Sequence, residues 1–233
     1  MLVAALAIAA QQISVPELGV LVFSKTAGFR HASIEDGKRM FKKLADENAW
    51  MLDVTEDADE FINLLPTKRV VVFLSTTGDV LNADQQKAFE AWYRKGGGFV
   101  GIHAAADTEY DWPWYGSLVG AWFKSHPAIQ KAEVIFEDVR HPITRGMPTV
   151  TERTDEWYDY RANPRGSVYV LAVLNTKTYN GHVMGDDHPI TWLHERDGGR
   201  SFYTGFGHTA ESYTEPLFVG MVTRAVKWAG KKL

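Results

Sequence analysis

The overall arrangement of the chain can be inferred outward from Gly96-Gly97-Gly98-Phe99-Val100-Gly101-Ile102-His103-Ala104-Ala105-Ala106-Asp107. A glycine-rich turn precedes the apolar run from Phe99 to Ile102, a pattern typical of a short buried strand. The strand ends in His103, and the small alanines after it leave space above that side chain. In open α/β sheets, ligands bind outside the carboxyl ends of the strands. A sharp strand-to-helix turn here would present an imidazole where hydrolases present a nucleophile.

The residues before this segment predict three more strands and two helices. The strands are expected over Leu18–Ser24, Met51–Thr55 and Arg69–Thr76, each carrying a run of apolar side chains. One helix is expected over Ile34–Asn48 with Ser33 as its N-cap, and a second opens with a capping box at Asn82 to Gln85 and ends at Gly96. This order of strands and helices is typical of a doubly wound α/β sheet.

The residues after His103 predict a more irregular second half. A short helix is expected over 112–119, strands over 132–137, 167–174, 189–194 and 201–206, and a closing helix over 216–229. Some of these strands are expected to form an antiparallel extension. We therefore predict one domain over residues 16–233, with a mostly parallel sheet and helices on both faces.

Composition excludes several classes of site. The 233 residues include 45% hydrophobic side chains, enough for a substantial core, and the formal net charge of −4 gives no indication of a nucleic-acid partner. The absence of cysteine excludes a thiol nucleophile, a disulfide framework and a thiolate metal site. No Walker spacing is present, and the GxGxxG spacing of Gly96, Gly98 and Gly101 leads into a strand instead of following one, so no nucleotide cofactor is expected.

The N-terminal segment has the character of an export signal. Met1–Ala10 is almost entirely apolar but too short to span a membrane, and Ala7-Ile8-Ala9 matches a signal-peptide cleavage pattern. The usual basic region before such an apolar stretch is missing. We interpret residues 1–15 as a signal-peptide remnant or an N-terminal extension, which favours a periplasmic or secreted protein over the alternative, a cytoplasmic one.

Three histidines are expected at one edge of the sheet. His31 follows the first strand, His103 the fourth and His208 the last, so their side chains can converge although they are far apart in sequence. With one carboxylate, such as that of Glu156, they could hold a divalent metal ion such as Zn²⁺. The same groups could instead transfer protons without a metal. His31, His103 and His208 are the metal-ligand candidates, although no compact motif such as HExxH is present.

Aromatic and acidic side chains surround these positions. His126, Trp157, Tyr158 and Trp192 could contact a sugar ring, while core packing is the alternative role for the aromatic residues. The acidic groups that could bind sugar hydroxyls, or could simply solvate loops, are Asp107, Glu109, Asp111, Asp155 and Asp159. His182 and His194 are expected at the surface or at a sheet edge.

Taken together, these segments resemble the ThuA-like (trehalose utilisation) family. The matching segments, in order, are Gly28–Ser33, Gly101–Ala105, His126-Pro127, His141–Thr144, Asp155–Tyr158 and Gly207-His208. The resemblance implies a flavodoxin-like, class I glutamine amidotransferase-like fold. His103 stands where the amidotransferases have their cysteine, and His208-Thr209-Ala210-Glu211 departs from their His-x-Glu spacing. The chain is therefore not expected to be a functional glutamine amidotransferase.

The family is associated with the use of disaccharides and of 3-keto sugars. We therefore expect an enzyme that acts on such a substrate by histidine acid–base or metal-assisted chemistry, as an isomerisation, an elimination or a hydrolysis. His103, His208 and Glu156 are the candidate catalytic residues, and the candidate substrate-binding residues are His31, His126, Trp157, Tyr158 and Trp192. A non-catalytic sugar-binding module is the alternative, an enzyme for a non-sugar substrate is a third hypothesis, and the sequence leaves open whether the chain forms an oligomer.

Overall fold

A nine-stranded sheet forms the centre of the computed structural model, which describes residues 18–233. Five strands are parallel neighbours in the order β2-β1-β3-β4-β11. Their bounds are β1 Leu18–Phe23, β2 Trp50–Thr55, β3 Val70–Leu74, β4 Gly98–Ile102 and β11 Gly199–Thr204. The predicted N-terminal signal or extension at residues 1–15 lies outside the described residues.

Four antiparallel strands extend the sheet beyond β11, in the order β10-β9-β6-β7. They are β6 Gln130–Phe136, β7 Val150–Asp155, β9 Tyr169–Leu174 and β10 His188–Arg196. Two short strands, β5 Phe123–Ser125 and β8 Asp159–Tyr160, pair with each other outside this sheet. The expected antiparallel extension is therefore present, and all the parallel pairing lies in the part of the sheet that carries the three histidines.

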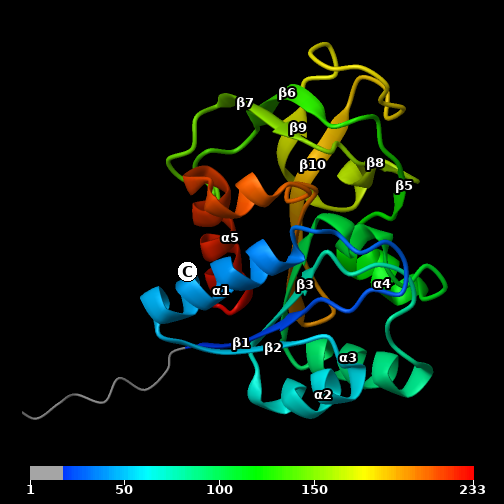
Figure 1. Cartoon of the computed structure of the whole chain (residues 1–233), viewed down its shortest axis with the longest axis vertical. Coiled ribbons are helices and arrows are strands. Elements are labelled where there is room, and N and C mark those ends of the chain that lie inside the picture. Colours follow the sequence, from blue (N-terminus) through cyan, green and yellow to red (C-terminus); the bar gives the residue numbers. More distant parts are fainter. Residues whose placement is uncertain (1–17) are drawn as a thin grey trace, which may run out of the picture.

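Helices cover both faces of the parallel region, as Figure 1 shows. α1 (Ile34–Asn48) and α5 (Pro216–Ala229) lie on one side, and α2 (Ala58–Leu64) and α3 (Ala83–Arg94) lie on the other. The short α4 (Pro113–Val119) joins the α3 side, because its Tyr115 contacts Phe73 of β3 and Phe99 of β4. The doubly wound α/β arrangement predicted from the sequence is confirmed.

Local sequence signals explain most of the element boundaries. The predicted capping box is present at α3, where the Asn82 side chain accepts hydrogen bonds from the N–H groups of Asp84 and Gln85. Ser33 precedes α1 as expected but does not cap it, because its hydroxyl donates to the carbonyl of Gly207. The sequence analysis missed α2, which begins after an Asp57 cap. Within residues 18–233, no helix combines the length and apolar character needed to cross a bilayer.

An aromatic cluster on the α3 face of the sheet carries much of the core. The Phe73 ring on β3 is fully buried and lies within 5.3–5.8 Å of five other aromatic rings. These rings belong to Phe23, Phe61, Phe89, Phe99 and Tyr115, which come from two strands and three helices. Burial of this many aromatic side chains is the main contribution of this face to stability.

Phe73→Ala should lower the free energy of unfolding by about 3–5 kcal/mol, because it leaves a cavity among these rings. The matched control is Phe29→Ala, since the Phe29 side chain is 67% exposed and its loss should change stability by less than about 0.5 kcal/mol. Urea unfolding of both variants measures the difference. Equal destabilisation by the two substitutions would contradict the assignment of Phe73 to the core.

Candidate functional site

Three imidazoles meet at the carboxyl edge of the parallel strands. His31 follows β1, His103 follows β4 and His208 lies four residues beyond β11. β1, β3, β4 and β11 are consecutive parallel neighbours, so their carboxyl ends lie along one edge. The ring centroids of His31 and His103 are 4.8 Å apart, and His208 lies 5.1 Å from each of them. The convergence predicted from the sequence is present.

His103 occupies a sharp turn between β4 and the 3₁₀ turn His103–Asp107. Its backbone φ is +50°, a left-handed conformation that is uncommon for a residue with a side chain. The turn is held by the Tyr203 hydroxyl, which donates to the His103 carbonyl at 2.8 Å. This geometry is that of the nucleophile elbow, with a fully buried imidazole in the presented position.

The tautomer of His103 follows from its partner. Its Nδ1 lies 2.9 Å from the carbonyl oxygen of Gly205, and because a carbonyl can only accept, Nδ1 carries the proton. The other nitrogen, Nε2, lies 3.2 Å from Nδ1 of His208. In its neutral form, His103 therefore directs a lone pair toward the other members of the group.

Glu156 adds a carboxylate to the three imidazoles. Its Oε2 lies 3.0 Å from His208 Nδ1 and 3.4 Å from His103 Nε2, and its Oε1 lies 3.1 Å from His126 Nδ1. One ligand-type atom from each of His31, His103, Glu156 and His208 lies within 4.8 Å of the others. We call these four residues the histidine cluster. His126 lies at its outer side, with 42% of its side chain exposed.

Burial and charge set the protonation of the histidine cluster. Burial lowers the pKa of His31 to about 3, with further lowering by the neighbouring imidazoles, so His31 is neutral near pH 7. Burial acts to raise the pKa of Glu156, but the neighbouring imidazoles of His103 and His208 outweigh burial and hold it well below its usual range. The Glu156 carboxylate raises the pKa of His208 in turn. The cluster thus combines an anionic carboxylate with at least one neutral, buried imidazole.

Asp155 fixes the backbone beneath two members of the cluster. Its fully buried carboxylate accepts hydrogen bonds from the backbone N–H groups of Glu156, Gly207 and His208 at 3.0–3.1 Å. The Arg153 guanidinium donates to the same carboxylate. The φ of +113° at Gly207 gives the chain a turn that presents both N–H groups of this loop. The sequence analysis offered Asp155 as a sugar contact or a loop residue, and the structure instead places it in the interior.

The predicted aromatic contacts divide into two groups. The centroid of the Tyr158 ring lies 4.2 Å from that of the His103 ring, so the two rings pack against each other. Trp157 and Trp192 are almost wholly buried, and their indole N–H groups donate to the carbonyls of Gln130 and Val119. Neither indole ring is exposed to a ligand, so the two tryptophans are core residues.

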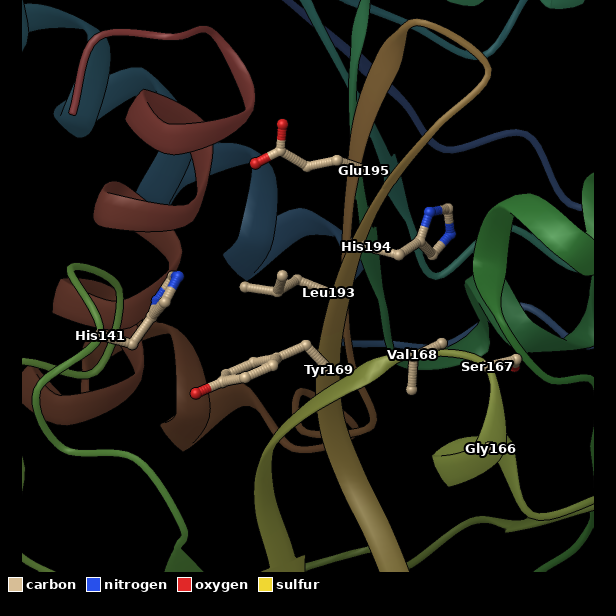
Figure 2. Close-up of a pocket in the computed structure, with 8 residues that line it drawn as sticks. All are labelled: His141, Gly166, Ser167, Val168, Tyr169, Leu193, His194 and Glu195. Atoms are coloured by element: carbon tan, nitrogen blue, oxygen red, sulfur yellow. The ribbon is translucent and has the colours of Figure 1, made fainter.

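A pocket at the ends of β9 and β10 is separate from this site. Figure 2 shows its lining, which includes His141, Tyr169, Leu193 and His194 and no member of the histidine cluster. His194 was expected at the surface or an edge, but its side chain is 7% exposed and its Nε2 donates to the Leu118 carbonyl in α4. The correction arises because α4 covers this part of β10.

An exposed aromatic ring borders the cluster and was not predicted. Phe29 is 67% exposed, and its ring meets the edge of the His31 ring at a centroid distance of 4.9 Å. Its backbone is nevertheless anchored, because the Thr77 hydroxyl donates to the Phe29 carbonyl at 2.8 Å. The only sequence signal was its place beside His31 in a glycine-containing loop.

Comparison with known families supports the resemblance seen in the sequence. The family model for ThuA, described as trehalose utilisation, matches residues 19–229. No curated protein matches the chain.

Solved structures with the same fold include two ThuA-like proteins. One, from Bacteroides uniformis, has a TM-score of 0.80 and 26% identity, with 96% of this chain and 95% of that chain covered. Another, from Parabacteroides merdae, has a TM-score of 0.76 and 18% identity, with 91% and 90% covered. A β-galactosidase from Bacillus circulans matches with a TM-score of 0.60 and 13% identity over 90% of this chain and 30% of its own. The last two likenesses concern the fold alone.

Asp155→Asn should lower the free energy of unfolding by about 3–5 kcal/mol, because the buried Arg153 charge loses its partner and an amide N–H faces backbone N–H donors. The control is Asp84→Asn, since Asp84 has a side chain that is 93% exposed. Urea unfolding should show little change in the control. A stability of Asp155→Asn equal to that of the wild type would show that this carboxylate does not hold the loop.

Proposed function

Because the chain belongs to the ThuA family, whose membership supports a carbohydrate-related function, we propose that it processes a disaccharide or a 3-keto derivative of one at the histidine cluster. The single observation behind the proposal is the convergence of three imidazoles and one carboxylate at the carboxyl edge of the parallel strands. Ligand sites of open α/β sheets are found at this edge. The expected chemistry is histidine acid–base or metal-assisted.

A 3-keto sugar suits these groups because its carbonyl acidifies the neighbouring C–H bonds. In an elimination, a base takes the proton from C2, the C–H electron pair forms a C1=C2 double bond, and the glycosidic oxygen leaves C1 with its bonding electrons and gains a proton. The carbonyl oxygen carries the developing negative charge. A positive charge held at the histidine cluster would stabilise that oxygen, and no oxidant or reductant is needed. Isomerisation starts with the same proton removal.

In this proposal, His126 moves the proton. Its Nδ1 faces Glu156 Oε1 and the Pro127 carbonyl, both of which accept, so its other ring nitrogen is left free to take a proton. The partial exposure of the His126 side chain lets a substrate reach it.

Phe29 supplies the apolar contact that a sugar ring requires. The C–H face of a pyranose is apolar, and an exposed phenyl ring beside the histidine cluster offers a surface for it. The anchored loop holds that ring in one place, which reduces the entropy lost on binding.

His103→Gln should lower the turnover rate of 3-keto-trehalose by about 100-fold or more in a protein that still folds. The matched control is His182→Gln, because His182 bonds only to the Thr176 carbonyl among residues 18–233 and lies outside the cluster. Release of glucose and the absorbance of the unsaturated ketone report turnover. Unchanged rates in His103→Gln would remove the catalytic assignment, and sugar binding without turnover by the wild type would favour the non-catalytic binding module.

Phe29→Ala should raise KM for the same substrate by about 5-fold while leaving kcat nearly unchanged, because stacking against an aromatic ring contributes about 1 kcal/mol. Phe29→Tyr keeps the ring and should restore the wild-type KM. The control is Tyr169→Ala, since Tyr169 is 49% exposed and lines the separate pocket. An unaltered KM in Phe29→Ala would exclude this ring from the substrate site.

A further inference from the structure

Lone pairs of the histidine cluster meet at one place, where a proton or a cation would be favourable. Neutral His103 presents a lone pair at Nε2, since its Nδ1 proton is donated to Gly205. Glu156 Oε2, which also carries lone pairs, lies 3.4 Å from that nitrogen. Two acceptors this close repel each other in a buried site unless a proton or a cation lies between them. His208 Nδ1 reaches the same place, at 3.0 Å from Oε2 and 3.2 Å from His103 Nε2.

A proton alone leaves His31 unexplained. Its side chain is 4% exposed, and its Nδ1 is buried with no hydrogen-bond partner among residues 18–233. A buried polar atom without a hydrogen-bond partner is unfavourable. A proton between His103 and Glu156 leaves the His31 nitrogen unpaired. It also places a positive charge beside the His31 ring. A cation that takes a lone pair from each imidazole and from Glu156 would bring all four side chains into one site.

The distances agree with a metal centre. Ligands about 2.0–2.1 Å from a tetrahedral zinc ion lie about 3.4 Å from one another. The three measured separations among His103 Nε2, His208 Nδ1 and Glu156 Oε2 are 3.0, 3.2 and 3.4 Å. The ligand atom of His31 lies within 4.8 Å of the others, so a small inward movement of this ring completes the set.

The groups around the cluster match those that support metal ligands. Ligating histidines commonly donate their second N–H to a carbonyl, as His103 does to Gly205. The second oxygen of Glu156 is held by His126, and the backbone N–H groups of Glu156 and His208 are held by Asp155. Imidazole and carboxylate ligands without a thiolate suit Zn²⁺ and its neighbours in the first transition row.

We propose that His31, His103, Glu156 and His208 bind one divalent transition-metal ion, most readily Zn²⁺. The proposal deepens the proposed function, because it names the positive charge at the site, but the binding itself does not depend on the substrate being a sugar. When bound, the ion would supply Lewis acidity toward a substrate oxygen. Proton transfer then belongs to His126, which is not a ligand.

Metal binding can be measured on the full chain without any substrate. Protein treated with a chelator and dialysed is titrated with Zn²⁺ by calorimetry and with Co²⁺ by visible absorption, which reports coordination geometry. We expect one ion per chain and a raised melting temperature in the presence of Zn²⁺. Absence of stoichiometric binding by the folded wild-type protein would overturn the proposal.

Two ligand variants and one control locate the ion. His31→Ala and Glu156→Gln should weaken Zn²⁺ binding by more than the roughly 10–100-fold that loss of an outer-shell partner costs, and both should alter the Co²⁺ spectrum. His182→Ala, outside the cluster, should bind as the wild type does. If either ligand variant fails to fold, His31→Gln provides the same test with a side chain of similar size. Wild-type affinity and spectrum in the folded ligand variants would place the ion elsewhere and refute the proposal.

Failure of this proposal can be told apart from failure of the proposed function. Turnover of 3-keto-trehalose by folded protein that fails to bind Zn²⁺ would overturn the metal centre and leave the carbohydrate activity standing. Stoichiometric Zn²⁺ binding that His31→Ala abolishes, without turnover of any sugar tested, would support the metal centre and count against the carbohydrate activity.

Discussion

Three imidazoles and a carboxylate share one small buried volume, which a positive charge between them would stabilise, and much of the surrounding structure holds them in that arrangement. The four parallel strands β1, β3, β4 and β11 end along a single edge, which places His31, His103 and His208 together. The strained turn at His103 directs one ring nitrogen inward, because the other is committed to Gly205. Asp155 then fixes the chain under Glu156 and His208. Each of these features fixes the position of a residue in the histidine cluster.

The sequence predicted the parts of this site that depend on regular structure. Apolar runs marked β1, β3 and β4, and parallel strands necessarily end on the same edge, so the meeting of the three histidines followed from topology. Glu156 was a candidate because a carboxylate could complete a metal-binding or proton-transfer group with the three histidines, and no periodicity pointed to it. Glu156 follows β7, which lies at the far edge of the sheet, and the sequence carries no signal for the irregular path that returns the chain to the cluster.

The details that escaped prediction depend on packing between distant segments. Asp155 is adjacent to Glu156 in sequence, yet its role is fixed by a loop 52 residues further on, which supplies the Gly207 N–H. Trp192 was a candidate for the cleft because of its type, but α4 covers it and accepts its indole proton. Phe29 differs from Trp192 because it is exposed. Phenylalanine is normally buried, yet this side chain lies in the open beside His31. The local sequence pattern around each of these residues does not determine its environment.

The amidotransferase-like scaffold carries a different chemistry once its elbow holds an imidazole. A cysteine at that turn would attack a carbonyl carbon directly, whereas a buried histidine with its Nδ1 proton committed can only accept a proton or bind a cation at Nε2. In the proposed function, the nucleophile of such a scaffold is exchanged for a fixed electrostatic centre. A substrate would then bring its reacting oxygen toward the cluster instead of its carbon toward a nucleophile. The more exposed His126 and Phe29 lie beside the cluster, so the proposal assigns binding and proton transfer to these two residues and charge stabilisation to the buried cluster.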